Sequence, residues 1–142
     1  MAMRCGILRV DRIAIHKGRR EMLLLSGDAV VRQYRVALGR NPVGPKLQEG
    51  DGKTPEGHYA IDRRNPQSAY HLSLHISYPE AADRDRARAT GVDPGGDIMI
   101  HGLKNGERRE GDWTQGCIAV TNEEMDEIWK LVADGTRVAI EA

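Results

Sequence analysis

The sequence has no phenylalanine, only two tryptophans and four tyrosines, two cysteines, and no excess of either charge. Its 21 Lys and Arg residues balance its 21 Asp and Glu residues, whereas binding to polyanions depends on a basic excess that releases counterions. So few aromatic side chains also leave little surface for stacking on bases. Apolar runs such as Met22–Leu25 are far shorter than the roughly 20 residues that span a bilayer. We therefore expect no nucleic-acid partner and no transmembrane segment.

The sequence also has little that indicates secretion or disulfide bonding. One arginine lies near the N-terminus, but the apolar stretch of a signal peptide does not follow it. Cys5 and Cys117 are too few to indicate an oxidising compartment, and their surroundings differ so much that we expect no disulfide. A chain of this length can form one hydrophobic core without disulfide or metal staples. We predict a single domain over residues 1–142, with residues 1–6 disordered or foreign to the fold.

Alternation of apolar and polar residues predicts a mainly β fold with one or two helices, because the strands mostly follow one another without helical crossovers. The first three strands are expected to form an antiparallel meander. On a later strand, Leu72, Leu74 and Ile76 share one face, and His71 and His75 share the opposite, polar face. The expected strands cover residues 8–15, 21–25, 29–38, a stretch from residue 58, 70–77, 98–100 and 136–141.

Helix signals occur twice, and one long segment favours neither helix nor strand. Thr121 and Glu124 match a capping box, and the apolar stripe that follows, which includes Trp129, predicts a helix. Residues 79–90 favour a solvated helix with proline at its first position. Residues 39–57 are too rich in Gly and Pro for a regular element and are long enough to form a functional loop.

His101 and Cys117 are the candidate catalytic pair. His101 ends a short apolar strand, and Cys117 follows 16 positions later, directly after Gly116. A thiol is nucleophilic as the thiolate, so it needs a base or a positive field that lowers its pKa, and histidine is the usual base. Gly116 allows close approach of the backbone, whose amides can bind an oxyanion. The alternative is a buried apolar cysteine and a structural histidine.

No metal or nucleotide site is predicted. His71 and His75 would stand about 13 Å apart on a strand, which is too far for one ion. His75 is instead expected to line a substrate groove. Gly52-Lys53-Thr54 is similar to the end of a P-loop, but the earlier glycine is absent and a proline follows at once.

Several motifs resemble the YkuD-type L,D-transpeptidase catalytic domain, a bacterial cell-wall enzyme family. Residues 98–102 and 114–118 are similar to its paired histidine and cysteine motif. Residues 53–59 resemble its Thr-Pro-x-Gly strand entry, and residues 36–39 resemble the strand end before it. The resemblance runs in order through nearly the whole chain. It implies a single-domain β-sandwich of the YkuD type.

The same resemblance implies a peptidoglycan L,D-transpeptidase without a cofactor. In this family a cysteine thiolate attacks the stem tetrapeptide, D-alanine leaves, and an amine acceptor resolves the acyl thioester. By motif position Cys117 is the nucleophile, His101 the base, and the backbone at Gly116 and Cys117 the oxyanion site. The implied partners are peptidoglycan stem peptides and an amine acceptor, which includes a wall-attached protein. The implied location is the periplasm or cell envelope.

Two positions depart from the commoner family pattern. Many members have histidine before the Gly-Cys pair and Arg or Asn two positions after the cysteine, where this chain has Gln115 and Ala119. The run Trp-Thr-x-Gly-Cys-Ile-Ala therefore resembles a divergent branch. Because the departures affect the acceptor, two alternatives stay open. One is an L,D-carboxypeptidase or amidase in which water resolves the thioester, and the other is a non-catalytic wall-binding module.

Residues around the motif are the candidate substrate contacts. Trp113 offers an aromatic surface beside the cysteine motif. Arg108 and Arg109 are candidates for binding a substrate carboxylate, with solvated loop charges as the alternative. The full predicted set of substrate-binding residues is His75, Arg108, Arg109, Trp113, Thr114 and Gln115.

Overall fold

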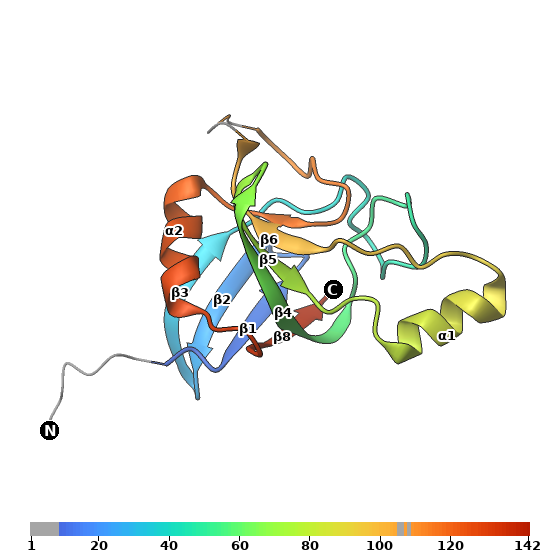
Figure 1. Ribbon diagram of the computed structural model, residues 1–142, viewed down its shortest axis with the longest axis horizontal. Helices are drawn as coiled ribbons and strands as arrows, with labels where there is room; N and C mark the ends of the chain where they lie inside the picture. The colour runs from blue at the N-terminus through green and yellow to red at the C-terminus, as the bar shows by residue number, and fades with distance from the viewer. Residues whose placement is uncertain (1–8, 105–106, 108) are drawn as a thin grey trace, which may run out of the picture.

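The computed structural model describes residues 9–104, 107 and 109–142 and confirms a mainly β fold with two helices (Figure 1). Its strands form one curled sheet in the order β3-β2-β1-β8-β4-β5-β6-β7. Residues 1–6, Cys5 and Arg108 lie outside the described residues. The elements are β1 (Arg12–His16), β2 (Glu21–Ser26), β3 (Ala29–Arg35), β4 (Gly57–Ser68), β5 (His71–Ile76), α1 (Ala81–Thr90), β6 (Met99–His101), β7 (Ile118–Ala119), α2 (Asn122–Leu131) and β8 (Arg137–Glu141).

The first three strands form the predicted antiparallel meander. Two of its boundaries differ by more than one residue from the sequence-based prediction. The strand expected at residues 8–15 is observed at residues 12–16. The strand expected to reach residue 38 ends at Arg35, because the backbone of Ala37 exchanges hydrogen bonds of 3.0 and 2.9 Å with Ala119 instead of β2.

Two connections give the sheet its curl and place the cysteine motif. β8, the last strand, lies between β1, to which it is parallel, and β4, to which it is antiparallel. β4 is long enough to pair with both β8 and β5, so it carries the sheet from one half into the other. At the other side of the curl, the bridge between Ala37 and Ala119 brings β7 against the end of β3. The segment that contains Cys117 is therefore held between β6 and the chain that leaves β3.

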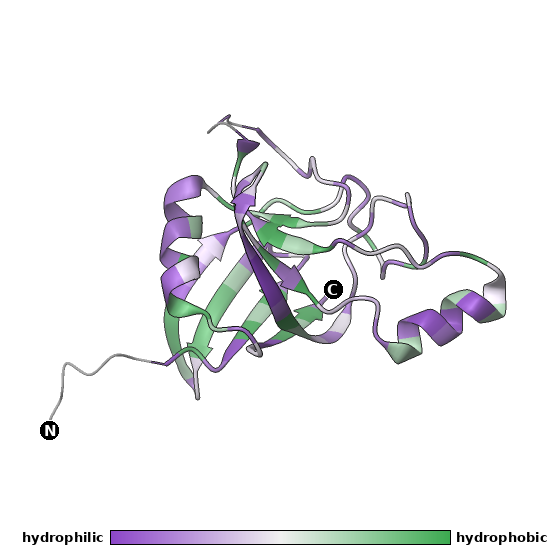
Figure 2. Ribbon diagram, viewed as in Figure 1, coloured by the Kyte–Doolittle hydropathy of each residue, from purple (hydrophilic) through white to green (hydrophobic). Residues whose placement is uncertain are grey.

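One hydrophobic core joins both halves of the sheet to α2. Figure 2 shows hydrophobic residues concentrated on β1, β2 and β6, whereas α1 is mostly hydrophilic. On β5, Leu74 and Ile76 are fully buried, as the alternation predicts. The core also includes Ile13, Leu24, Ile61, Ile100, Ile118, Met125, Ile128 and Val138.

α2 begins as the sequence predicts, and α1 begins two residues later than expected. The Thr121 hydroxyl accepts the Glu124 N–H at 3.2 Å, and the Glu124 carboxylate accepts the Thr121 N–H at 3.0 Å. α1 has Glu80 as its N-cap, and the Glu80 N–H donates to the Asp83 carboxylate at 3.0 Å. Pro79 therefore precedes the cap instead of starting the helix. Neither helix of the described chain is long and apolar enough to cross a membrane.

Candidate active site

One face of the β5-β6-β7 edge carries His101. Leu74 pairs with Ile100 across β5 and β6, and both side chains are buried in the core. Because side chains alternate along a strand, the neighbouring pairs lie on the opposite face. These pairs are Ser73 with His101 and His75 with Met99.

Cys117 lies on the same face as His101. Ala119 of β7 pairs with His101 in the parallel ladder, and Ile118 points into the core. Continuing this alternation by one residue places Cys117 on the face of Ala119. The thiol and the imidazole therefore project from neighbouring strands, offset by two residues, or about 6.6 Å along the strand. The structure thus places the two predicted catalytic residues on one face of neighbouring strands.

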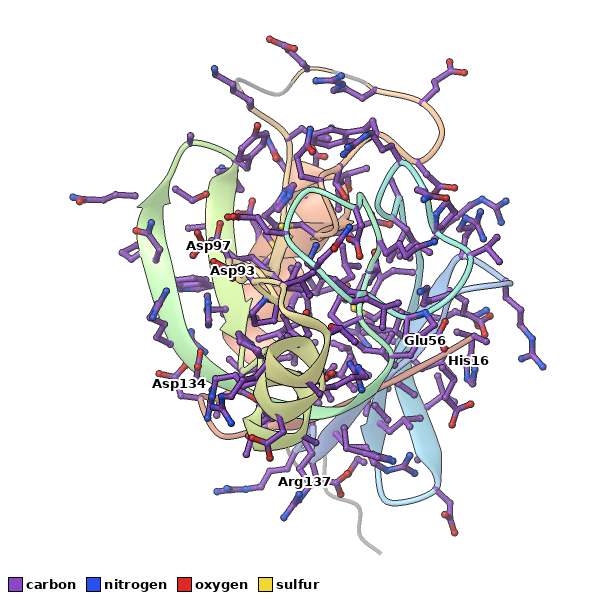
Figure 3. All side chains as sticks on the ribbon, turned by 90° about the vertical axis from the view of Figure 1, so that its right-hand side faces the viewer. His16, Glu56, Asp93, Asp97, Asp134 and Arg137 are labelled. Atoms are coloured by element: carbon purple, nitrogen blue, oxygen red, sulfur yellow. The ribbon has the colours of Figure 1, made fainter. Side chains whose placement is uncertain are left out.

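The Cys117 thiol is partly exposed and is held by backbone groups. Its Sγ donates to the Asp97 carbonyl oxygen at 3.3 Å, and the Met99 N–H donates to Sγ. Figure 3 labels Asp97 beside Asp93 in the segment that leads from α1 to β6. Burial raises the pKa of the Cys117 thiol, the Met99 N–H opposes that rise, the Asp97 carboxylate adds to it, and the Lys46 ammonium opposes it.

His101 is held as a neutral imidazole with one free nitrogen. The ring is buried, at 4% exposure, and Nδ1 lies 2.7 Å from the Gly102 carbonyl oxygen. A carbonyl oxygen only accepts, so Nδ1 carries the proton and Nε2 retains its lone pair. Burial lowers the pKa of His101, and the Gly102 hydrogen bond partly opposes this. The thiol is therefore not activated by a resting imidazolium, which differs from the expectation of a lowered thiol pKa.

The turn before Cys117 requires glycine at position 116. Gly116 has φ +134°, and a Cβ there would lie 2.7 Å from the Lys53 carbonyl oxygen. The buried Thr114 hydroxyl accepts the Gly116 N–H at 3.0 Å and donates to the Cys117 carbonyl oxygen at 2.8 Å. Thr114 was predicted to contact substrate, but its side chain is buried and its hydroxyl supports the turn. Because the Gly116 N–H already donates to Thr114, the Cys117 N–H is the remaining donor of the predicted oxyanion site.

The thiol opens into a cavity of about 280 Å³ whose wall includes Lys46, Asp97 and Gln115. Lys46 is buried, at 3% exposure, and its ammonium lies 3.0 Å from the Asp51 carboxylate. The long loop predicted at residues 39–57 therefore contributes a cation to this cavity. Sequence reasoning missed Lys46 and Asp97. The unusual length of that loop was the signal for Lys46 alone. The Gln115 side chain accepts a hydrogen bond of 2.5 Å from Arg40.

Trp113 contacts the imidazole and not the thiol cavity. Its ring centroid lies 5.8 Å from that of His101, and Tyr70 completes the group at 4.7 Å from His101. The Arg109 guanidinium lies over the Trp113 ring at 4.5 Å. Trp113 and Arg109 line a second cavity, of about 440 Å³, which does not include Cys117.

His75 lies on the predicted polar face but is already paired. Its Nδ1 is 2.6 Å from the Asp62 carboxylate, and its side chain is 12% exposed. His71 pairs separately with Asp126 of α2 at 2.6 Å. Among residues 9–104, 107 and 109–142, no group of three or more His, Cys, Asp or Glu side chains is arranged to hold a metal ion.

Comparison with known proteins identifies the family. The L,D-transpeptidase catalytic domain YkuD matches residues 10–140. YafK of Escherichia coli strain K12, named as an L,D-transpeptidase, is 36% identical over 102 residues, which cover 70% of this chain and 36% of YafK. YkuD of Bacillus licheniformis, also named as an L,D-transpeptidase, is 27% identical over 134 residues, which cover 91% of this chain and 64% of that protein.

Solved structures show the same fold. The helical cell shape determining protein Pgp2 of Campylobacter jejuni superimposes with a TM-score of 0.73 at 27% identity, covering 91% of this chain and 46% of Pgp2. An L,D-transpeptidase from Xylanimonas cellulosilytica gives a TM-score of 0.62 at 16% identity, covering 94% of this chain and 61% of that chain. This chain therefore spans only part of these relatives. With the family match extending over residues 10–140, the chain belongs to the YkuD family of L,D-transpeptidase catalytic domains.

Proposed function

We propose that this domain is a cysteine-dependent acyltransferase of the bacterial cell envelope that acts on peptidoglycan stem peptides. One observation carries the proposal: Cys117 and His101 project from the same face of neighbouring strands, and the thiol opens into a cavity. Membership of the YkuD family supports the peptidoglycan substrate and the envelope location. Neither Cys117 nor His101 needs a cofactor for the chemistry that follows.

The proposed reaction starts from a neutral thiol and a neutral imidazole. Burial raises the pKa of Cys117 and lowers that of His101, so both effects disfavour a resting thiolate–imidazolium pair. The proton therefore moves to Nε2 of His101 as Sγ attacks the carbonyl carbon between the third residue and D-alanine. The Cys117 N–H is the donor proposed for the oxyanion.

Collapse of the tetrahedral intermediate breaks the bond to D-alanine. The imidazolium returns its proton to the leaving amine, and an acyl thioester remains on Cys117. An acceptor amine then attacks this thioester, His101 removes the amine proton, and the thiolate of Cys117 leaves and is reprotonated. If water replaces the amine, the same steps give a carboxylic acid, which makes the domain an L,D-carboxypeptidase or amidase.

Mass spectrometry of products tests the proposal. The domain is incubated with a tetrapeptide muropeptide and a free amine acceptor, beside Cys117→Ala and His101→Ala variants. Amine-exchanged or cross-linked products that require Cys117 are expected from the wild type. Cys5→Ser is the matched control, because it removes the other thiol and should retain the activity.

Three other results would change the assignment. Shortened products that are indifferent to the amine would replace the transpeptidase with the hydrolase. Turnover that survives in Cys117→Ala would contradict the mechanism. Binding to sacculi without any turnover would favour the non-catalytic wall-binding module.

A further inference from the structure

The carbonyl group that holds His101 belongs to a peptide unit that is itself held by α2. Nδ1 of His101 lies 2.7 Å from the Gly102 carbonyl oxygen. That oxygen is part of the peptide unit that joins Gly102 to Leu103, and the Leu103 N–H donates to Oδ1 of Asn122 at 2.7 Å. Two short hydrogen bonds therefore run in series from the imidazole, through one peptide unit, to the first residue of α2.

Glycine at position 102 allows Asn122 to come this close. A Cβ at Gly102 would collide with Oδ1 of Asn122, and it would lie only 3.2 Å from the Tyr70 carbonyl oxygen. The Gly102 N–H donates to that same Tyr70 oxygen at 3.0 Å. The backbone that follows His101 is therefore fixed by two separate contacts, one from the turn between β4 and β5 and one from α2.

The start of α2 is well fixed and can serve as an anchor. The capping box between Thr121 and Glu124 sets the backbone on either side of Asn122. Just before the cap, the Val120 N–H donates to the carbonyl oxygen of His101 at 2.9 Å. The same short segment therefore holds both the strand that carries the imidazole and, through Asn122, the peptide that accepts from it.

This series of bonds affects the base during the proposed reaction. When Nε2 of His101 takes the thiol proton, the ring becomes an imidazolium and its Nδ1–H donates more strongly to the Gly102 carbonyl oxygen. An acceptor on the Leu103 N–H polarises the peptide unit and makes that oxygen a better acceptor. The Asn122 side chain therefore favours both the Nδ1–H form of the resting imidazole and the imidazolium that follows it.

We propose that Asn122 is a positioning residue for the general base: it fixes and polarises the Gly102–Leu103 peptide, which holds His101 with Nε2 free for the Cys117 thiol. The catalytic pair then extends to a chain of four groups, namely the thiol, the imidazole, the peptide unit and the Asn122 amide. The inference rests on the proposed function, because that function makes His101 the base.

Other titratable groups near His101 stay unchanged when Asn122 is replaced. In the described part of the chain they come from the β4–β5 turn, from the cysteine motif and the segment before it, and from α2: Tyr70, His71, Arg109, Cys117, Glu124 and Asp126. A change in the titration of His101 in these variants therefore reports the Asn122 contact.

Nitrogen NMR of the imidazole tests the role of Asn122 without turnover. In protein labelled with 15N-histidine, the His101 signals are those absent from His101→Ala, and they report its tautomer and its pKa. We expect the Nδ1–H tautomer in the wild type. Asn122→Leu, which has a similar size but no acceptor, should populate the Nε2–H tautomer and lower the pKa of His101. Asn122→Asp keeps the acceptor and adds a negative charge, so it should retain the tautomer and raise the pKa of His101 by about one pH unit.

Turnover of the tetrapeptide muropeptide gives a second measurement. Asn122→Leu should lower kcat about 10- to 100-fold with little change in KM, because a misplaced base affects the chemical step. Asn122→Asp should recover most of that loss. Thr121→Ala is the matched control, because it removes the N-cap hydroxyl beside Asn122 and leaves the bond to the Leu103 N–H in place. It should lower the urea unfolding midpoint without changing the tautomer of His101.

The outcomes separate the role of Asn122 from the proposed function. A wild-type imidazole with its proton on Nε2 would overturn the inference, and so would an Asn122→Leu domain in which His101 keeps the wild-type tautomer and titration. The same NMR changes in Thr121→Ala would assign them to a loosened helix and would also overturn it. Circular dichroism checks folding, and if Asn122→Leu is unfolded, an unchanged pKa of His101 in Asn122→Asp is the result that overturns the inference. The expected NMR changes in a domain that turns over no muropeptide would support the role of Asn122 and refute the transferase.

Discussion

Asp51 organises the loop that supplies Lys46 to the thiol cavity, and its removal should destabilise the domain measurably. Its carboxylate accepts hydrogen bonds from the Lys46 ammonium at 3.0 Å and from the backbone N–H groups of Leu47, Gln48 and Lys53 at 2.9, 3.1 and 3.1 Å. The side chain is 10% exposed. Asp51→Asn keeps the shape of the side chain but removes its charge and turns half of its acceptor capacity into a donor.

The magnitude follows from the pKa of this carboxyl. Burial alone would raise the pKa of Asp51, but the four hydrogen bonds together lower it from the ordinary 3.8 to about 2. That difference corresponds to about 2 kcal/mol of stability at neutral pH. Because the folded-state pKa of Asp51 is the lower one, this stability is present above about pH 4 and is lost as pH falls towards 2.

Urea unfolding at several pH values measures the effect. At pH 7 the unfolding midpoint of Asp51→Asn should lie about 1 M below that of the wild type, given an m value of about 2 kcal/mol/M. The difference between the two proteins should shrink as pH falls from 4 towards 2. Asp28→Asn, at an exposed turn position, is the control and should shift the midpoint little. A difference that is the same at pH 2.5 and pH 7 would refute the reasoning.

Three further predictions concern the face that carries His101 and Cys117. Thr114→Val leaves the Gly116 N–H and the Cys117 carbonyl without the Thr114 hydroxyl and should lower stability by about 1–3 kcal/mol per lost bond in urea unfolding, whereas Thr114→Ser should retain most of it. Because burial raises the pKa of Cys117, iodoacetamide should alkylate it more slowly in the native protein at pH 8 than in the unfolded chain, and peptide mapping that found the opposite would sink the argument. Because burial lowers the pKa of His101, the acidic limb of the pH profile of kcat/KM should have its midpoint below pH 6.5. A midpoint at or above that value would show that His101 is not the base.

Local patterns in the sequence predicted the elements that depend on neighbouring residues. The capping box at Thr121 and Glu124 and the alternation around Leu74 and Ile76 are confirmed, because each is set by residues a few positions apart. The early end of β3 was not predictable in this way. It depends on Ala37 meeting Ala119, a partner far along the chain.

The candidate site also has features that the sequence predicted and features that depend on tertiary packing. The order of His101, Gly116 and Cys117 pointed to a common site, and the β6–β7 pairing places the first and last on one face. The burial of Lys46 against Asp51 and the stacking of Trp113 on His101 come from tertiary packing, which no local pattern encodes. The sequence predicted a lowered pKa for the Cys117 thiol, whereas the pKa is raised. This too comes from tertiary packing, since burial of the thiol outweighs the nearby positive charge of Lys46.

The central position of β8 has a consequence for how the domain is made. Without β8, the meander β1–β3 and the sheet β4–β7 lose the strand that joins them. During synthesis, or during passage through a membrane as an unfolded chain, residues 137–141 emerge after every other element. The Ala37–Ala119 bridge that holds the Cys117 segment therefore becomes stable only when the whole domain is available. A partly emerged chain therefore contains Cys117 but lacks the strand that completes the fold around it.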